Sequence, residues 1–109
     1  MAAKKYRAGT SVIADMFPKA RVEFIHGDSL TVNLWEFDEG GDVPSHQHPH
    51  EQIVHCLEGL FEVVVDGEAL VLEAGESVVI PGGTEHSARA LTASRGIDIF
   101  HPVREDYRF

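Results

Sequence analysis

Three histidines and one glutamine of this chain can hold a metal ion. His46, His48 and Gln52 lie in one glycine-punctuated segment, and His86 lies in a second one further along. Imidazole nitrogen is the preferred protein ligand for zinc, copper, iron and nickel, and a side-chain oxygen suits harder divalent ions. Four donors from two separate segments can enclose one cation and leave coordination positions open. The sequence therefore predicts one divalent transition metal, and the donor set does not distinguish Ni, Zn, Fe, Mn, Cu or Co.

The elements that must position these donors have the pattern of short β-strands. Asp66-Gly67 is the clearest turn, because Asp-Gly supplies the positive φ angles of a type I′ hairpin. Turn residues recur at short intervals and no convincing helical periodicity is present, which predicts an all-β sandwich or barrel. The expected strands are 21–26, 30–37, 45–48, 51–57, 61–65, 68–72, 77–80, 85–90 and 97–100, with a loop over 38–44 and either a short helix or a strand within 11–20.

Strand alternation can aim all the candidate ligands into one barrel interior. His46 and His48 are two residues apart and so point to the same side, and Gln52 and His86 can face the same interior from their own strands. The opposite strand faces are partly apolar, which indicates that one sheet packs against another subunit. We therefore expect a homodimer. His50 at a bend and His55 on an outer face are not expected to be ligands.

Bulk composition excludes some classes of partner. The chain has 109 residues and a formal net charge of −9, so a broad basic face for nucleic acid is not expected. We expect a single domain over residues 1–109, with residues 1–10 as a loosely ordered tail. No stretch is apolar enough for a membrane span. The lone cysteine, Cys56, fits a reducing compartment, and the expected location is the cytoplasm.

Two motifs resemble those of the cupin family. Residues 40–59 follow G-x5-H-x-H-x3-Q-x6-G, which resembles the first cupin motif, and residues 75–86 follow G-x5-P-x-G-x2-H, which resembles the second. The family normally has Glu at the position of Gln52, and the final Asn of its second motif is here Ala90. This resemblance implies a double-stranded β-helix, or jelly-roll barrel, with the metal near its wider mouth.

A narrower resemblance covers most of the chain. The runs HQHPHEQ, GESVVIPGGTEH and DIFHPVREDYRF look like those of the small KdgF-type cupins of pectin and alginate breakdown. Those enzymes convert 4,5-unsaturated monouronates into linear keto sugars, and they place Gln with three His in the metal site. Their catalytic Asp, Phe and Arg fall on Asp98, Phe100 and Arg104. The resemblance implies a metal-dependent enzyme of uronate metabolism whose small-molecule substrate is an anionic sugar.

The neutral amide of Gln52 bears on the type of chemistry. Compared with a carboxylate, a neutral ligand leaves the bound cation more electron-poor. This favours Lewis-acid catalysis at a substrate oxygen over redox cycling of the metal. Two other functions stay open: a metal-dependent dioxygenase or C–C bond-cleaving cupin, and a non-enzymatic cupin that binds a sugar or metabolite. Oxygen consumption separates the first of these from uronate conversion. A pure binder needs no acid beside the metal.

Each residue of the C-terminal segment has a structural alternative to its functional role. Asp98 is expected to shuttle a proton, or else only to orient a ligand histidine or bond to backbone. Phe100 is a wall for the sugar ring or a plain core residue. Arg104 pairs with a substrate carboxylate, or with Glu105, Asp106 or a neighbouring subunit.

Overall fold

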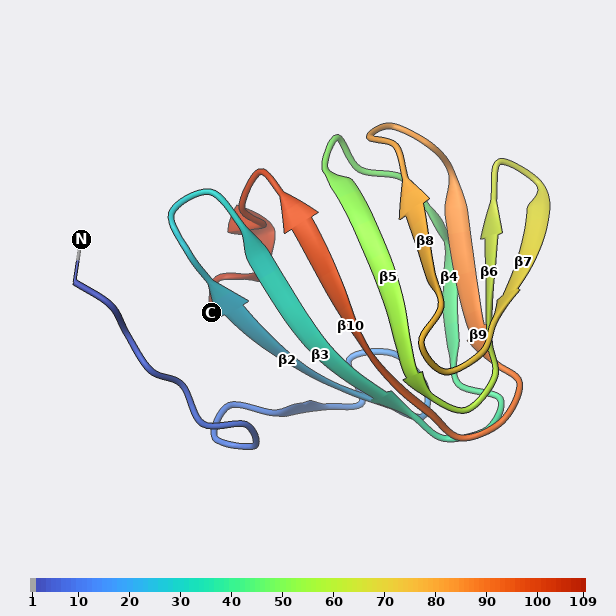
Figure 1. The fold of residues 1–109 in the computed structure, drawn as a ribbon, viewed down its shortest axis with the longest axis horizontal. Coiled ribbons are helices and arrows are strands. Elements are labelled where there is room, and N and C mark those ends of the chain that lie inside the picture. The colour runs from blue at the N-terminus through green and yellow to red at the C-terminus, as the bar shows by residue number, and fades with distance from the viewer. Residues whose placement is uncertain (1) are drawn as a thin grey trace.

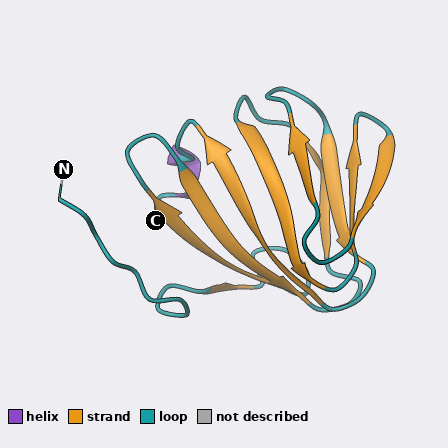
Figure 2. Cartoon of the chain, in the orientation of Figure 1, coloured by secondary structure: helices purple, strands orange, loops and turns teal. Residues whose placement is uncertain are grey.

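The computed structural model describes residues 2–109 and is built almost entirely of β-strands, with one short 3-10 turn (Figures 1 and 2). The all-β prediction is therefore confirmed. The elements are β1 (Ile13–Ala14), β2 (Ala20–His26), β3 (Thr31–Phe37), β4 (Asp42–His46), β5 (Glu51–Glu58), β6 (Phe61–Val65), β7 (Glu68–Leu72), β8 (Ser77–Ile80), β9 (His86–Ala90), β10 (Ser94–His101) and η1 (Glu105–Tyr107).

The strands form two antiparallel sheets that curve towards each other (Figure 1). One sheet has the order β1-β2-β3-β10-β5-β8 and the other has the order β4-β9-β6-β7. In the larger sheet, β10 lies between β3 and β5, so Asp98 has Asn33 on one side and Val54 on the other. Two rows further along, Phe100 lies between Thr31 and Gln52. The last strand is thus at the centre of the wall that carries the candidate site.

The hairpin predicted at Asp66-Gly67 is confirmed. Strands β6 and β7 pair with Val65 opposite Glu68, and both turn residues have positive φ, 48° at Asp66 and 81° at Gly67. Consecutive positive φ angles are what a type I′ turn requires, and its twist matches that of the flanking strands.

Two strands begin three residues earlier than predicted, and the other bounds agree to within two residues. The segment expected as a loop over 38–44 contributes Asp42–Pro44 to β4. β4 is an edge strand, where a proline such as Pro44 is tolerated because its missing N–H would face away from the sheet. β10 begins at Ser94 instead of residue 97, because Ser94, Arg95 and Gly96 already pair with β3. Within residues 11–20, the structure has the short strand β1.

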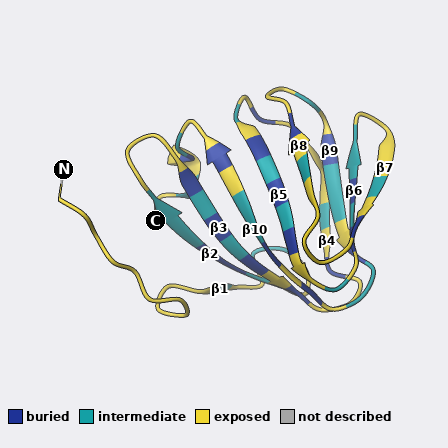
Figure 3. Cartoon of the chain, in the orientation of Figure 1, coloured by how far each residue is buried: buried dark blue, intermediate teal, exposed yellow. Residues whose placement is uncertain are grey.

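The core lies between the two sheets, where buried residues alternate along β3, β5 and β10 (Figure 3). Trp35, Phe37 and Phe61 form an aromatic cluster with ring centroids 4.3–5.6 Å apart. This cluster fills the end of the barrel where β10 begins. The polar interior residues therefore gather at the other end, where β10 finishes and β5 starts. No helix within residues 2–109 is long and apolar enough to cross a membrane.

Candidate metal centre

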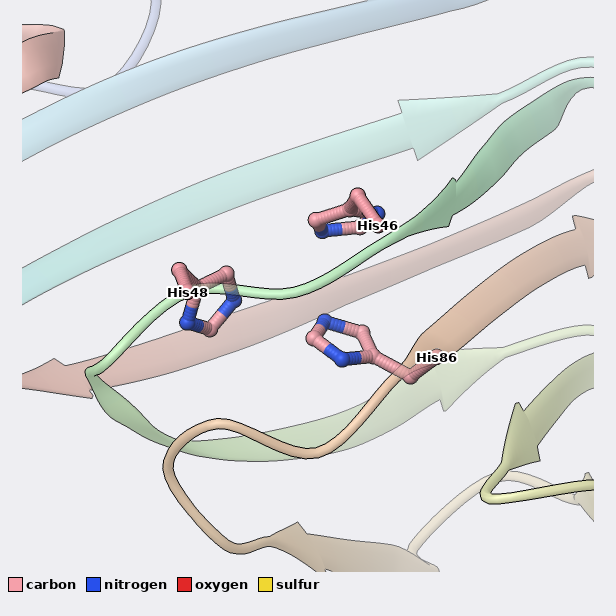
Figure 4. A group of neighbouring side chains, drawn as sticks. All are labelled: His46, His48 and His86. Carbon is pink, nitrogen blue, oxygen red and sulfur yellow. The ribbon is translucent and has the colours of Figure 1, made fainter.

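Three histidines from two chain segments converge at the polar end of the barrel (Figure 4). His46 ends β4, His48 follows it in the connection to β5, and His86 begins β9. His46 and His86 are direct cross-strand partners, and their ring centroids lie 4.3 Å apart. One ligand nitrogen from each of the three rings lies within 4.8 Å of the others. This spacing fits a single divalent metal ion.

The backbone orients all three imidazoles in the same way. Each Nδ1 lies 2.8–3.1 Å from a carbonyl oxygen two residues away: that of Pro44 for His46, that of His50 for His48 and that of Thr84 for His86. A carbonyl can only accept a hydrogen bond, so each Nδ1 carries the proton. The Nε2 lone pairs are then left for another partner, which is the arrangement of metal-binding histidines.

Burial keeps the two inner imidazoles neutral. Loss of hydration lowers the pKa of His48 to about 4, with the charges of Arg104 and His86 adding to the effect. Loss of hydration also lowers the pKa of His86. A neutral imidazole is the form that binds a metal. Nε2 of His86 is buried and has no hydrogen-bond partner, and an unpaired polar atom of this kind is costly unless a ligand completes it.

Gln52 adds an oxygen beside the imidazoles. It is 7 % exposed, and its Oε1 lies 3.1 Å from Nε2 of His48. Gln52 also lies close enough to Asp98 to be one of the groups that lower the pKa of that carboxyl. The amide oxygen and the unprotonated Nε2 are both acceptors, so no proton joins them. A cation bound to both atoms would remove the repulsion between these two acceptors. The residues present therefore fit a metal ion.

Asp98 lies on β10 and is held by two hydrogen bonds from β3. Asn33 Nδ2 donates to its Oδ2 at 3.1 Å, and Trp35 Nε1 donates to its Oδ1 at 3.0 Å. Burial raises the pKa of Asp98 to about 7, although the hydrogen bonds from Asn33, Trp35 and Gln52 and the charge of Arg104 act to lower it. A carboxyl with such a pKa can both give and take a proton at neutral pH. Within residues 2–109, the partners of the Asp98 carboxylate are side chains and not backbone groups.

Arg104 lies between two aromatic rings. Its guanidinium carbon is 4.8 Å from the centroid of Phe100 and 4.3 Å from that of Tyr107. Nε and Nη2 donate to the carboxylate of Asp106 at 3.0 and 2.7 Å, so the predicted alternative pairing with Asp106 is present. The side chain is only 6 % exposed. No hydrogen bond within residues 2–109 uses Nη1, which is left for a ligand.

One cavity connects these groups. Its polar lining includes Asn33, His46, Gln52, His86, Asp98 and Arg104, and most of its other lining residues are apolar. Asn33 was not among the residues singled out from the sequence. The signal for it is the alternation of β3, whose buried positions are Thr31, Asn33, Trp35 and Phe37. A polar residue in such an inward series indicates a site.

His50 and His55 are not part of the cluster of three histidines. His55 is on the outer face, where its Nδ1 contacts Ser77 Oγ at 2.6 Å. His50 lies beside His48 at a ring distance of 5.5 Å, and its Nδ1 is buried without a partner. Cys56 is fully buried in the core. His55 therefore lies away from the histidine cluster, whereas His50 lies next to it.

The sequence matches the Cupin domain family over residues 33–100. The chain is a cupin. This match spans both histidine motifs and the strand that carries Asp98 and Phe100. The jelly-roll architecture expected from the resemblance is thereby confirmed.

Individual cupins similar to this chain include two KdgF proteins. The chain is 33% identical over 82 residues to the pectin degradation protein KdgF of Dickeya dadantii, covering 73% of this chain and 74% of that protein. The structure of KdgF from Halomonas sp. superposes with a TM-score of 0.81 at 34% identity, covering 92% of this cupin and 99% of that chain. An RmlC-like cupin from Shewanella frigidimarina gives a TM-score of 0.89 at 30% identity, covering 98% and 97%. The chain thus resembles the KdgF-type cupins.

Proposed function

We propose that this cupin is a metal-dependent enzyme that converts 4,5-unsaturated monouronates into linear keto sugars during pectin or alginate breakdown. The observation that carries the proposal is the placement of Asp98 and Arg104 on one cavity with the histidine cluster. The cavity combines a group that can exchange a proton with a cationic group for a carboxylate. The similarity to the KdgF proteins supports this choice of substrate.

His46, His48, Gln52 and His86 would hold the metal. When bound there, a divalent cation supplies a Lewis acid that stabilises negative charge on a substrate oxygen. Arg104 would bind the sugar carboxylate through Nη1, because Asp106 occupies Nε and Nη2. Phe100 packs edge-on to His48, with ring centroids 5.8 Å apart, and would form a wall for the sugar ring.

The conversion is an isomerisation, so no atoms are added. The C1 hydroxyl loses its proton, the bond between C1 and the ring oxygen breaks, and the ring oxygen keeps the electron pair. The resulting enolate becomes a C5 ketone when C4 takes up a proton. Asp98 would deliver that proton, because its pKa of about 7 leaves a share of the carboxyl protonated at neutral pH.

The test of this function uses the metal-loaded protein and 4,5-unsaturated galacturonate or its epimer. We expect the ultraviolet absorbance of the conjugated alkene to disappear faster than in the spontaneous reaction. Mass spectrometry should show a product of unchanged mass, and an oxygen electrode should show no consumption. Oxygen uptake with a heavier product would instead indicate a dioxygenase. Tight sugar binding without conversion would indicate a binding protein.

We further propose that the protein is a homodimer formed through the outer face of the larger sheet. Val32, Ile99, Ile53 and Val79 lie in one row across β3, β10, β5 and β8. Ile99 is 38 % exposed and Val79 is 56 % exposed. An apolar row of this kind is typical of a covered face. Val79→Asp should convert the dimer to a monomer in light scattering, and an unchanged mass would contradict this interface.

A further inference from the structure

We propose that Thr31 and His26 are positioning residues that hold Arg104 at the cavity, an inference that rests on the role given to Arg104 in the proposed function. Neither residue lines the cavity. Both act through the chain segment that follows β10, which includes η1 and carries Arg104.

A one-way series of hydrogen bonds links Thr31 and His26 to this segment. The backbone N–H of Arg104 donates to Thr31 Oγ1 at 2.8 Å, Thr31 Oγ1 lies 2.8 Å from His26 Nδ1, and His26 Nε2 lies 3.0 Å from the carbonyl oxygen of Tyr107. An amide only donates and a carbonyl only accepts. His26 therefore carries its proton on Nε2, and the Thr31 hydroxyl donates to Nδ1. Every group in the series is satisfied.

The series anchors η1 at both ends. Arg104 precedes η1 and Tyr107 is its last residue, so Thr31 holds the backbone on one side and His26 holds it on the other. Phe24 adds a stacked contact to the Tyr107 ring, with centroids 4.5 Å apart. β10 ends at His101, so strand pairing does not order Arg104. Its place depends on the anchors from β2 and β3.

The anchored segment in turn confines the guanidinium. The Tyr107 ring stacks on the guanidinium carbon, and the Asp106 carboxylate accepts hydrogen bonds from Nε and Nη2. Both partners belong to η1 itself, so they can align Arg104 with the cavity only if the segment stays docked. Thr31 is fully buried, and replacing its hydroxyl would leave the Arg104 N–H without a partner in a dry environment.

The test compares Thr31→Val, which keeps the shape and removes the hydroxyl, with Thr31→Ser, which keeps the hydroxyl. The first readout needs no substrate: hydrogen exchange of the Arg104 Nε–H, followed by NMR of 15N-arginine-labelled protein. We expect slow exchange in wild type and Thr31→Ser. We expect fast exchange in Thr31→Val, similar to that of Asp106→Asn, which removes the charged partner directly.

The second readout is kinetic, on metal-loaded protein with the unsaturated uronate. Thr31→Val should raise KM roughly tenfold while kcat changes much less, because carboxylate binding is weakened and proton transfer is not. Thr31→Ser should restore KM. A Thr31→Val variant with wild-type exchange and KM would overturn the proposal, as would a Thr31→Ser variant as impaired as Thr31→Val, since the methyl packing would then be the cause.

His26 provides a second pair if Thr31→Val does not fold. His26→Gln keeps a donor for the Tyr107 carbonyl, and His26→Leu removes it. Faster exchange of the Arg104 Nε–H in His26→Leu than in His26→Gln supports the proposal, and equal exchange contradicts it. If wild type converts no uronate, the proposed function fails, whereas the exchange measurement still decides whether Thr31 and His26 position Arg104.

Discussion

Gly96 lies directly opposite Trp35 in the β3–β10 pair, and a side chain at position 96 would occupy the space of the indole ring. A Cβ there would also meet the carbonyl oxygen of His55. The missing side chain lets the indole lie against the strand and donate its N–H to Asp98 at 3.0 Å. A glycine two residues before the candidate acid thus sets the surroundings of its carboxyl.

Gly96→Ala should therefore damage both stability and activity. The added methyl displaces the indole or the strand, and overpacking of this kind costs about 1–3 kcal/mol of unfolding free energy. Chemical denaturation measures that loss, and uronate conversion should fall as well because Trp35 no longer holds Asp98.

The matched control is Gly67→Ala in the β6–β7 turn. A Cβ there meets nothing within 4 Å, and only the backbone strain of positive φ, about 1 kcal/mol, is expected. Equal activity in the two variants would contradict the role of Gly96.

Local patterns predicted much of the architecture. Alternation with period two indicated that the candidate metal ligands face one interior, and the structure brings His46, His48, His86 and Gln52 together at one end of the barrel. The Asp66-Gly67 turn was predictable because its chemistry is confined to two neighbouring residues. The cupin spacing predicted the fold, which the family match confirms.

Other features depend on contacts between distant segments. The anchoring of Arg104 by Thr31 joins β3 to the C-terminal segment, and neither residue carries a local signal of the other. Pro44 lies in the segment that the sequence predicts as a loop, because its place on an edge strand follows only from the order of the sheet. The same limit applies to Gly96, whose small size matters only through Trp35 across the strand.

Glu23 should make the docking of the N-terminal segment depend on pH. Its carboxylate accepts the backbone N–H groups of Gly9 and Ser11, each at 2.9 Å, and these hydrogen bonds lower its pKa below the ordinary value of 4.5. A lowered folded-state pKa gives stability that is complete above the unfolded value and is lost as pH falls through the folded one. Protection of the Gly9 and Ser11 amides, measured as exchange relative to that of an unfolded chain at the same pH, should therefore be high near neutral pH and fall as pH drops below 4.5. Glu23→Gln should show low protection at both pH values, and high protection in that variant would show that another contact holds the segment.

Gln52→Glu should bind a divalent metal more tightly and convert uronate more slowly. The added negative charge strengthens metal binding but makes the bound cation a weaker Lewis acid. It also places a like charge beside Asp98. Competition with a chelator measures the affinity, and His86→Ala serves as the reference that should lose metal by roughly a hundredfold or more. A Gln52→Glu variant with unchanged affinity would remove Gln52 from the proposed ligand set.

Arg104→Lys should raise KM for the uronate by roughly tenfold. A lysine ammonium cannot form the two parallel hydrogen bonds to Asp106 and at the same time donate to the substrate carboxylate. Arg108→Lys is the matched control, because Arg108 is exposed and pairs with Glu105 on the surface. Steady-state kinetics should show little change in the control. Identical KM values in the two variants would place the substrate carboxylate elsewhere.

Asp98→Asn should leave the metal in place and remove the proton donor. Asn33 can accommodate the change, because its Oδ1 has no partner and can accept from the new amide once the Asn33 side chain turns over. The most direct test is therefore the initial rate of alkene loss in metal-loaded wild type and Asp98→Asn at equal metal content. We predict that wild type clearly exceeds the spontaneous rate and that the variant is slower by about 10²–10⁴-fold. A wild-type rate no faster than the spontaneous reaction, or a variant as fast as wild type, would contradict the assignment of this site to uronate conversion through Asp98.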